Sequence, residues 1–583
     1  MNNNALQKDC YLLGRILLKL EKEQEALFYL KKSHQLKEEH KSEFLDRTYR
    51  SVFMESLATT NEELISLLEK LSKKDNNKNY EQQAFYYSEG GKAMALLDML
   101  GEATQGIRSK IPKAVSEEIN LLHAKINALQ TLFSSANETE EKEGILEKIV
   151  RAQENLRALE LKSRELYPKY ASIMTPAPKN IEYVQRSILK DNETALLEYY
   201  TGVENSFVFV VTKNDFNLIS LKKSDSEFLK DIKKLRAPFE GIKSGSFLLG
   251  ELKKSDINLF SKLYSELVEC TIPFLKGVNK IIIIPHGSLN YISFEMLAPR
   301  IEHKGYNENV LLSEYAKPHY LVEDYSITYA PSISILDPEF FRKEKETIKS
   351  GDILVFANPA FGQVPSNETD KTESEGFLTR SIRESIESLP HSEMEAEMIT
   401  RSFKNPLIYE KQNASEEIFI KQSPYYPMIH LSTHAFINQN LPIYSSLVFA
   451  YNDEIKDVDL LHAYEIFSLD LNCELITLSA CETGIGEDAE RLGGEGVTGL
   501  SRAFLYAGAK SLVVSLWQVS DESTSILMAE FYKNLKEKGM SKVEALRQAK
   551  LSLMKMEKKI GNRSLSYSHP FFWAPFILIG EPD

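Results

Sequence analysis

Two residues that could act together as a nucleophile and its general base each follow an apolar segment predicted to be a strand. The segment MIHLSTHAF places His434 just past the end of one strand, and ELITLSACETG places Cys481 just past the end of another. An imidazole beside a thiol can lower the pKa of the thiol or take its proton, which produces a thiolate nucleophile. Sites in parallel sheets form at the carboxyl ends of strands, so neighbouring strands would turn both side chains toward one crevice. The pair therefore indicates cysteine-dependent nucleophilic chemistry.

The other cysteines and histidines have simpler interpretations. Cys473 precedes the second of these strands, and we expect it and Cys270 to be small packed hydrophobes. His430 lies inside a strand and is expected to be a satisfied core residue. His286 follows a further strand but has no matching cysteine in its half of the chain, so we interpret it, like His569, as structural. A serine-hydrolase elbow is not expected either, because GLSRA at 499–503 lacks the final glycine and lies in a helical pattern.

The composition is that of an ordinary globular protein. The chain has 583 residues, 43% hydrophobic and 26% charged, which corresponds to about three to four domains. The 84 acidic residues exceed the 70 basic ones, and the net charge of −14 argues against direct nucleic-acid binding. Four cysteines without a CxxC pair favour a reducing, cytoplasmic location without a disulfide scaffold, and no metal or other cofactor is expected. The sequence shows neither a signal peptide nor an apolar run of membrane-spanning length.

Residues 1–110 are predicted to be helical and to contain a repeat of the tetratricopeptide type. Small residues in this repeat would let two helices approach closely while leucines fill the space between them, at Leu13, Gly14, Leu17, Ala26, Leu30 and Ser33. A second, degenerate helix pair is expected at 44–71. Two coiled-coil-like seams then predict a helical hairpin at 111–178. We expect the helices either to bind a protein partner, such as an activator, or to support the C-terminal half.

From residue 179 onward, apolar strands alternate with helical patterns. A β-meander is predicted at 195–221, and four consecutive isoleucines predict a buried strand at 280–285. Further strands are predicted at 352–358, 406–409, 428–432, 474–478, 511–516 and 576–579, with helices at 496–506, 523–536 and 542–555. This alternation predicts a mostly parallel sheet covered on both faces. We divide the region into two halves, 179–348 and 349–583.

Several segments of this region together match one family, in the order in which they occur. They are IIIIPHGSLNYISFEML, FANPAF, LPHSEMEAEMI, HLSTHAF, SLVFA, LSACETGIG, GGEGVTGLSRAFLYAGAKSLVVSLWQVSD and HPFFWAPFILIG. Residues 180–583 therefore resemble a CHAT domain, a caspase-related cysteine-peptidase family often preceded by tetratricopeptide repeats. The resemblance implies an α/β caspase-like fold. Residues 179–348 would form a pseudo-symmetric, pseudo-caspase half and residues 349–583 the catalytic half.

The resemblance also implies a dyad of His434 and Cys481. Cys481 would attack the scissile carbonyl, and His434 would act as general acid and base, protonating the leaving amine. The backbone N–H groups of Cys481 and Ala435 would be the oxyanion donors. Members of the family usually have glycine after the histidine, whereas this chain has Ala435, which keeps the N–H group.

An acidic, glycine-rich loop, ETGIGEDAERLGGEG, follows the cysteine. Its glycines fit neither the GxxxxGK(S/T) nor the GxGxxG spacing of phosphate-binding loops, and its carboxylates would repel phosphate. We therefore expect a loop that orders on activation or substrate binding. Glu482, Glu487 and Asp488 could line a pocket for a basic P1 side chain, and the alternative is a solvated acidic loop. Asp521 either belongs to the wall of that pocket or caps the following helix, and capping is favoured because aspartate is a strong N-cap residue.

Two functions are consistent with these features. The first is a cysteine endopeptidase that cleaves a specific protein partner and is regulated through its helical N-terminal region. Bacterial members of the family often work beside defence systems, so by analogy the substrate could be a gasdermin-like pore former or another toxin in an antiviral pathway. The alternative is a catalytically inactive scaffold that recruits protein partners. An activated thiolate at Cys481 would distinguish the first function from the second.

Overall fold

The computed structural model describes most of the chain. The described residues are 3–40, 47–102, 178–239, 246–299, 309–337, 350–361, 388–438, 442–452, 457–479, 495–517 and 521–583, with Lys125, Lys148, Arg151 and Asn155. The chain forms two compact units, one made of Met1–Lys92 and Lys179–Asp583 and the other of Ala93–Pro178. The helical hairpin predicted at 111–178 falls outside the described residues except at those four positions, which are helical, and at residue 178.

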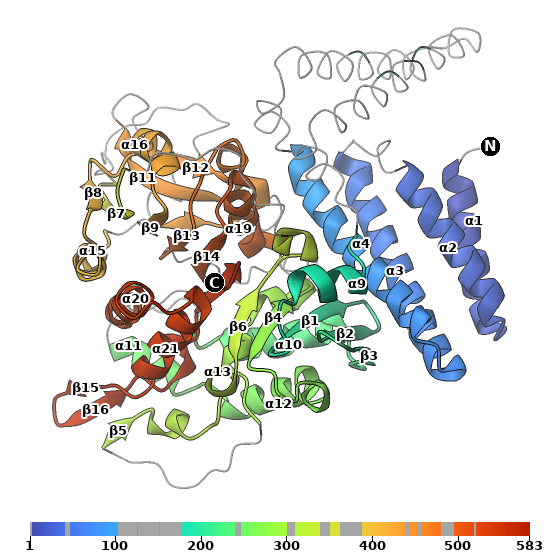
Figure 1. Ribbon diagram of the computed structural model, residues 1–583, viewed down its shortest axis with the longest axis horizontal. Helices are drawn as coiled ribbons and strands as arrows, with labels where there is room; N and C mark the ends of the chain where they lie inside the picture. Colours follow the sequence, from blue (N-terminus) through green and yellow to red (C-terminus); the bar gives the residue numbers. More distant parts are fainter. Residues whose placement is uncertain are drawn as a thin grey trace. The chain divides into compact units, whose positions relative to one another are not determined.

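The N-terminal region begins with the predicted helix pair, drawn in blue in Figure 1. Helix α1 (Asn3–Lys19) packs against α2 (Glu23–His40). Gly14 is needed here, because a Cβ atom at this position would lie 2.8 Å from the side chain of Leu30. The prediction for Leu13 is wrong: its side chain is 37% exposed. Gly14 and Leu17 occupy the inner face of α1, and Leu13 precedes Gly14 by about 100° of helical rotation, which turns it outward.

The predicted second helix pair at 44–71 is also wrong. Helix α3 runs without a break over Arg47–Asp75, packs against α2, and is joined to α4 (Lys78–Glu102) by a hydrogen bond of 2.8 Å from the hydroxyl of Ser72 to Glu81. No glycine or proline interrupts α3, so nothing in its sequence stops the helix earlier. The turn comes at Asn76, which has a left-handed φ of 47°, a conformation that asparagine tolerates better than most residues.

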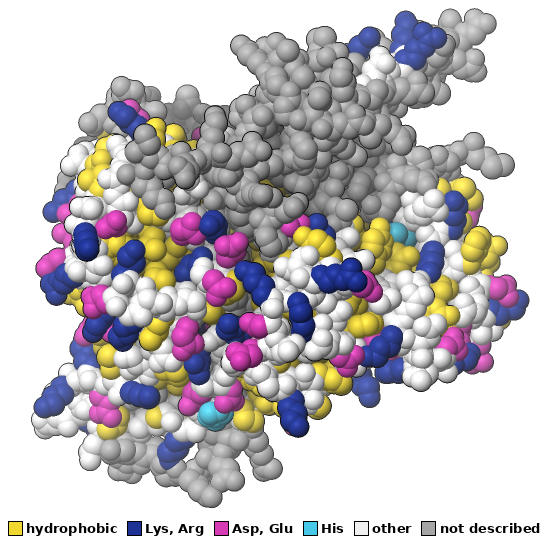
Figure 2. Space-filling model, in the orientation of Figure 1, with side chains coloured by type: hydrophobic (Ala, Val, Ile, Leu, Met, Phe, Trp, Pro, Cys, Tyr) yellow, Lys and Arg dark blue, Asp and Glu magenta, His cyan; other side chains and the backbone are white. Residues whose placement is uncertain are grey.

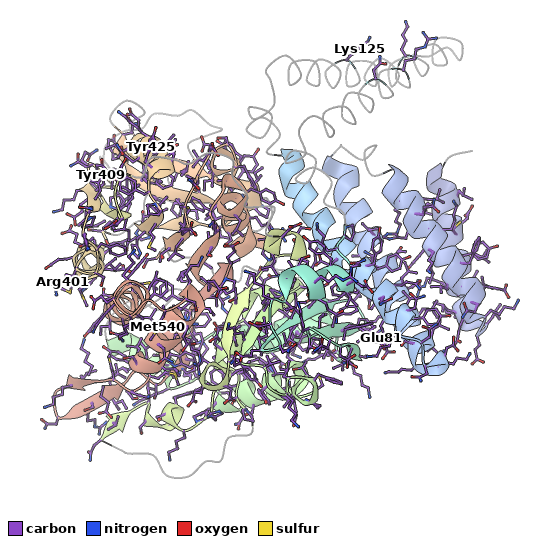
Figure 3. All side chains as sticks on the ribbon, viewed as in Figure 1. Glu81, Lys125, Arg401, Tyr409, Tyr425 and Met540 are labelled. Atoms are coloured by element: carbon purple, nitrogen blue, oxygen red, sulfur yellow. The ribbon has the colours of Figure 1, made fainter. Side chains whose placement is uncertain are left out.

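Helices α3 and α4 pack against the strands that follow them. The carboxylate of Glu62 in α3 accepts hydrogen bonds of 2.7–2.8 Å from three consecutive backbone N–H groups, those of Val203, Glu204 and Asn205. Glu81 of α4, labelled in Figure 3, accepts one of 3.2 Å from the N–H of Leu218. The buried apolar side chains of these helices and strands belong to one continuous core. The N-terminal helices are therefore built into the α/β region.

Among the described residues, eleven strands form one sheet in the order β3-β2-β1-β4-β6-β17-β14-β13-β9-β7-β8. One side contains β1 (Thr194–Thr201), β2 (Ser206–Val211), β3 (Phe216–Ser220), β4 (Lys280–Ile284) and β6 (Ser326–Tyr329). The other contains β7 (Ile353–Pro359), β8 (Pro406–Lys411), β9 (Met428–Ser432), β13 (Leu475–Leu478) and β14 (Ser511–Ser515). Strand β17 (Phe576–Gly580) joins the two sides, parallel to β6 and antiparallel to β14. The five strands β8, β7, β9, β13 and β14 are mutually parallel.

Helices and two small sheets complete the described structure (Figure 1). The helices are α9 (Ile181–Tyr183), α10 (Asp225–Arg236), α11 (Ser246–Leu252), α12 (Ile257–Leu267), α13 (Leu321–Asp324), α15 (Pro390–Thr400), α16 (Glu416–Gln422), α17 (Ala463–Ile466), α19 (Glu495–Ala507), α20 (Asp521–Lys536), α21 (Lys542–Leu553) and α22 (Pro570–Trp573). One small sheet contains β10 (Ala435–Phe436), β11 (Ser446–Asn452) and β12 (Asp457–His462), and the other β5 (Val310–Leu311), β15 (Glu557–Ile560) and β16 (Arg563–Ser566).

The predicted strands of the main sheet are confirmed, and their burial explains why they were recognisable. The isoleucines of β4 and all residues of β13 are buried, as expected for parallel strands covered on both faces. The sequence missed β6 and both small sheets. All four residues of strand β15, with the sequence EKKI, are exposed, and the strand has no apolar pattern to recognise.

The described surface carries both signs of charge. On the face shown in Figure 2, Lys and Arg side chains lie among Asp and Glu side chains over the described elements. Across the described residues, no helix combines the length and the apolar character that crossing a membrane would require.

Candidate functional site

Strands β9 and β13 are direct neighbours, and they run parallel. Leu475 to Leu478 of β13 pair in order with Met428 to Leu431 of β9, so each residue pairs with the one 47 positions before it. The backbone N–H of Ser479 extends this pairing, donating to the carbonyl of Leu431 at 2.9 Å. His434 comes two residues after the last residue of β9. The strands that precede His434 and Cys481 therefore end side by side.

Some of the predicted site residues cannot be placed. Cys481, Glu482, Glu487 and Asp488 lie outside the described residues, so the nucleophile, its N–H group and the acidic pocket stay predictions. Asp521 is the first residue of helix α20, which begins two residues earlier than predicted. Its side chain lies outside the described part of the chain, so the capping and pocket alternatives stay predictions.

His434 is half-buried and lies past the carboxyl end of β9, an interior strand of the sheet. Its backbone carbonyl accepts a hydrogen bond of 2.9 Å from the N–H of Val448 in β11. Its imidazole ring contacts the ring of Phe361, which follows β7, with the ring centroids 5.2 Å apart. A hydrogen bond of 2.7 Å from the N–H of Tyr451 to the carbonyl of Ala360 ties the end of β7 to β11. The imidazole, which follows β9, thus contacts an aromatic ring that follows the adjacent parallel strand β7.

Ala435 has backbone geometry that suits an alanine. It is the first residue of β10, pairs antiparallel with Leu447 and is 4% exposed. It is not among the residues with positive φ, so its methyl group causes no backbone strain. Hydrogen-bonded and non-hydrogen-bonded pairs alternate along an antiparallel ladder. Since His434 accepts from Val448, the next pair is of the second kind, and the N–H of Ala435 points away from β11.

A buried polar network lies beneath the ends of β9 and β13. Its centre is Glu395 of α15, which is 3% exposed. The carboxylate accepts hydrogen bonds from the hydroxyl of Ser432, 2.8 Å to Oε2, and from that of Ser479, 3.0 Å to Oε1. The Nε2 atom of His430 lies 3.3 Å from Oε1. Sequence reasoning missed Glu395, although it lies within the matched segment LPHSEMEAEMI.

The same network contains His430 and Tyr532. His430 is fully buried, and its Nδ1 lies 3.2 Å from the hydroxyl of Tyr532. The hydroxyl of Thr477 lies 2.8 Å from the same oxygen. Burial raises the pKa of Tyr532, so its phenol stays protonated and can act as a donor. His430 is therefore a core residue, as predicted, but only its Nδ1 has a hydrogen-bond partner, since Nε2 makes no hydrogen bond in the described structure.

The other histidines singled out from the sequence are structural as well. The Nδ1 atom of His286 accepts a hydrogen bond of 3.1 Å from the N–H of Thr201, and its ring stacks on that of Tyr200. The Nδ1 atom of His569 accepts one of 3.1 Å from the N–H of Phe571. Burial lowers the pKa of each imidazole to about 3, so both are neutral at physiological pH.

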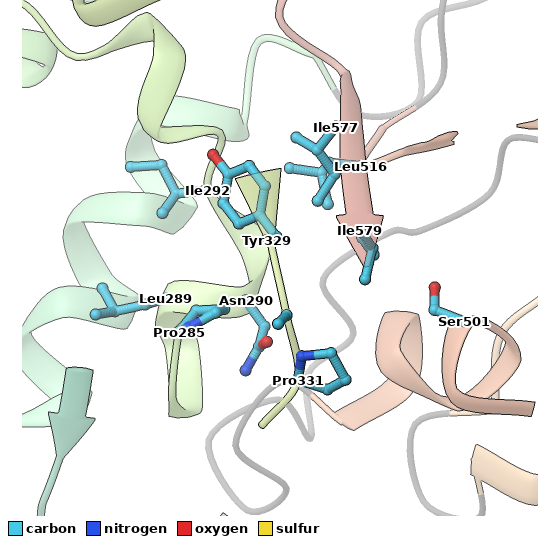
Figure 4. Close-up of a pocket in the computed structure, with 11 residues that line it drawn as sticks. Pro285, Leu289, Asn290, Ile292, Tyr329, Pro331, Ser501, Leu516, Ile577 and Ile579 are labelled. Carbon is cyan, nitrogen blue, oxygen red and sulfur yellow. The ribbon is translucent and has the colours of Figure 1, made fainter. Parts of the chain in front are cut away.

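A separate pocket lies between the two sides of the sheet (Figure 4). Its lining includes Pro285 and Pro331, which follow β4 and β6, together with Ile577 and Ile579 of β17. Most of this lining is apolar, and none of it comes from β7, β9 or β13. Ser501 also lines the pocket but lies inside α19, as predicted for the segment GLSRA, so it is not on a nucleophile elbow. We place the candidate active site at His434 rather than here.

Metal ligation gains no support from the described residues. None of them form a group of three or more His, Cys, Asp or Glu side chains that could hold a metal ion.

Comparisons with known proteins give a family and several distant similarities. The model of the CHAT domain matches residues 258–581, more than half of the chain. Tetratricopeptide repeat protein 28 of Homo sapiens is 34% identical over 122 residues, which are 21% of this chain and 4% of that protein. The Mus musculus protein of the same name is 33% identical over 122 residues, with the same coverage. The chain thus spans only a small part of the length of these curated relatives.

Two solved structures are also similar to this chain. The Saccharomyces cerevisiae separase–securin complex has a TM-score of 0.38 and 11% identity, covering 100% of this chain and 47% of that chain. The Arg specific cysteine proteinase gingipain R has a TM-score of 0.30 and 10% identity, covering 61% of this chain and 74% of that chain. These scores are too low to carry an argument. The family match, the mixed α/β sheet and the helical N-terminal region confirm the predicted fold class.

Proposed function

Because the chain belongs to the CHAT-domain family, we propose that it is a cysteine endopeptidase with Cys481 as nucleophile and His434 as general acid and base. The observation that carries the proposal is the parallel pairing of β9 and β13. Each residue of β13 pairs with the one 47 positions before it in β9, and Cys481 follows His434 by the same number of residues. Continuing this register by three residues would bring the thiol opposite the imidazole, as proton transfer requires.

The proposed reaction follows from these two groups. The imidazole of His434 takes the proton of the Cys481 thiol, and the thiolate attacks the carbonyl carbon of the scissile peptide bond. As the tetrahedral intermediate collapses, the imidazolium gives its proton to the leaving amine and an acyl-enzyme remains. Water, deprotonated by the same imidazole, then attacks the thioester, which releases the new carboxyl terminus and restores the thiol.

Two backbone groups are proposed to stabilise the oxyanion of the intermediate. The N–H of Ala435 supports this role because the β10–β11 pairing turns it away from β11 and leaves it free of that ladder. The second proposed donor is the N–H of Cys481 itself. Such fixed donors act at the position where charge develops in the transition state.

The substrate is proposed to be a specific protein, and the N-terminal helices are proposed to bind an activator or the substrate itself. The shared core of α3, α4 and β1–β3 supports a regulatory role, because binding at these helices would act on the same sheet that carries β9. By family analogy alone, we extend the proposal to a role in bacterial defence. Glu482, Glu487, Asp488 and Asp521 are proposed to favour a basic P1 residue.

The test is the digestion of a proteome-derived peptide library, with the new termini read by mass spectrometry. We expect cleavage by the wild-type chain and none by Cys481→Ala or His434→Ala. One dominant P1 residue would describe the pocket, and a Lys or Arg preference would support the acidic loop. Cys473→Ala is the matched control. Because Cys473 is 1% exposed, its thiol is not accessible to substrate, and this variant should cleave peptides as the wild-type chain does.

The same experiment distinguishes the scaffold alternative. Equal cleavage by wild type and Cys481→Ala, both alone and with candidate activators, would contradict the peptidase proposal. Selective alkylation provides a second measurement, because an activated Cys481 should react with iodoacetamide much faster than Cys10 or Cys270. Burial raises the pKa of both reference thiols, which makes them suitable standards.

A further inference from the structure

We propose that Glu395 is a positioning residue of this active site. It holds the segments that carry His434 and Cys481 in the register set by β9 and β13. The inference rests on the function proposed above. Glu395 is remote from both residues in sequence, being on helix α15, and the residue is 3% exposed. It contacts neither the peptide substrate nor the reacting atoms in this proposal, so its effect passes through the two serines that it binds.

The geometry of the two serines carries the argument. Ser432, the last residue of β9, donates to Oε2 of Glu395 at 2.8 Å, and Ser479, the first residue after β13, donates to Oε1 at 3.0 Å. Ser432 precedes His434 by two residues, and Ser479 precedes Cys481 by two residues. One carboxylate therefore holds both segments at equivalent positions, two residues before each proposed dyad residue.

A buried carboxylate is well suited to this task. A carboxyl group has two oxygens with several lone pairs, so it can accept from two hydroxyls at once. Past the paired residues of β9 and β13, the N–H of Ser479 donates to the carbonyl of Leu431 at 2.9 Å. The glutamate adds a second tie beyond it. A misplacement of about 1 Å in an active site can cost about 100-fold in rate.

The other side of the sheet offers a matched control. Glu295 is also 3% exposed, and it accepts hydrogen bonds from the hydroxyl of Ser293 at 2.9 Å and from Nζ of Lys550 at 2.8 Å. The hydroxyl of Tyr329 donates to Glu295 as well. Glu295 is therefore as buried as Glu395 and also binds hydroxyl donors, but its segment follows β4, which carries no matching cysteine. Replacing Glu295 should affect stability without affecting His434 or Cys481.

The experiment compares Glu395→Gln, Glu295→Gln and His434→Ala in the full chain. We would measure the pH dependence of Cys481 alkylation by iodoacetamide, and kcat and KM on a substrate peptide identified by library cleavage. For Glu395→Gln we expect kcat and the alkylation rate at pH 7 to fall by about 10- to 100-fold, with KM changed by less than about twofold. Glu295→Gln should lower the thermal midpoint but keep both rates.

The outcomes distinguish failure of the positioning role of Glu395 from failure of the proposed His434–Cys481 dyad. If His434→Ala slows alkylation and a folded Glu395→Gln does not, the positioning role is overturned and the dyad stands. If His434→Ala has no effect on alkylation or cleavage, the dyad fails, and the positioning role fails with it. Should Glu395→Gln not fold, Ser479→Ala and Ser479→Thr replace it. The alanine must slow both rates and the threonine, which keeps the hydroxyl, must restore them, or the inference is overturned.

Discussion

Ser432 and Ser479 lie on different segments of the chain, yet their hydroxyls donate to the two oxygens of one carboxylate, that of Glu395. They are 47 residues apart, the same offset that pairs β9 with β13 and that separates His434 from Cys481. The shared acceptor thus continues the register of the sheet past the ends of its strands.

Removing either serine hydroxyl should loosen the ends of both strands. In Ser432→Ala and Ser479→Ala we expect a loss of about 1 kcal/mol in local stability, because each removes one hydrogen bond to a buried acceptor. That loss corresponds to about fivefold faster hydrogen exchange in peptides covering β9 and β13. The double variant should be non-additive, since both hydroxyls share Glu395. Combining Ser432→Ala with Ser293→Ala is the additive control, and additivity in the first pair would argue against the shared tie.

Phe361 should orient the imidazole of His434. The two rings have centroids 5.2 Å apart, and contacts of this type contribute about 0.5–1.5 kcal/mol. We expect Phe361→Ala to lower kcat/KM for peptide cleavage by about two- to tenfold. Phe361→Tyr keeps the ring and should retain the wild-type value. An alanine variant as active as wild type would show that the contact does not orient the base.

Glycine is required after His286 but not after His434. Gly287 has a φ of +57°, and a Cβ atom there would overlap the carboxylate of Asp225 and the hydroxyl of Thr201. Gly287→Ala should therefore lose about 1–3 kcal/mol of stability, seen as a lower thermal midpoint.

Ala435→Gly is the reciprocal change, and we expect it to be tolerated. Ala435 has no positive φ, and glycine keeps the N–H group, so peptide cleavage should persist, with a loss of about 1 kcal/mol or less from the strand. Loss of cleavage in Ala435→Gly with an unchanged thermal midpoint would contradict this view of the oxyanion donor.

Buried neutral histidines should destabilise the folded chain in acid. Burial lowers the pKa of His286 from 6.5 to about 3, so between these values the unfolded chain binds a proton that the folded chain does not. Stability therefore falls as the pH is lowered from about 6.5 toward 3, by up to about 1.4 kcal/mol per pH unit for this residue. The measurement is the thermal midpoint of His286→Gln and of the wild-type chain from pH 7 to pH 4. We expect the midpoint of the variant to decline less steeply as the pH is lowered.

His319 provides the control for that experiment. It is exposed, and a hydrogen bond of 2.8 Å to Asp324 raises its pKa, which gives its contribution the opposite sign. That contribution is fully present below pH 6.5 and is lost as the pH rises through the raised value. His319→Gln should therefore not flatten the acid decline. Equal flattening in both variants would show that burial of His286 is not the cause.

The sequence alone determined the local elements and the residues at their ends. Strand β9 was predicted with its observed bounds, and β13 within one residue, because short apolar runs bounded by polar residues are a property of contiguous chain. The same runs placed His434 past the end of its strand and His430 inside it. The positions of Gly14 and Ala26 likewise indicated that α1 and α2 approach closely.

Only the tertiary structure decided which distant groups meet. Glu393, Glu395 and Glu397 occur at every second position of α15 and look alike in sequence. Glu397 nevertheless pairs with exposed Arg401, labelled in Figure 3, whereas Glu395 is buried. Its partners are 37 and 84 residues away. Periodicity describes which residues share a face of a helix, but the burial of that face depends on the strands packed against it. The order of those strands, including the placement of β17 between β6 and β14, is set by contacts between segments far apart in the chain.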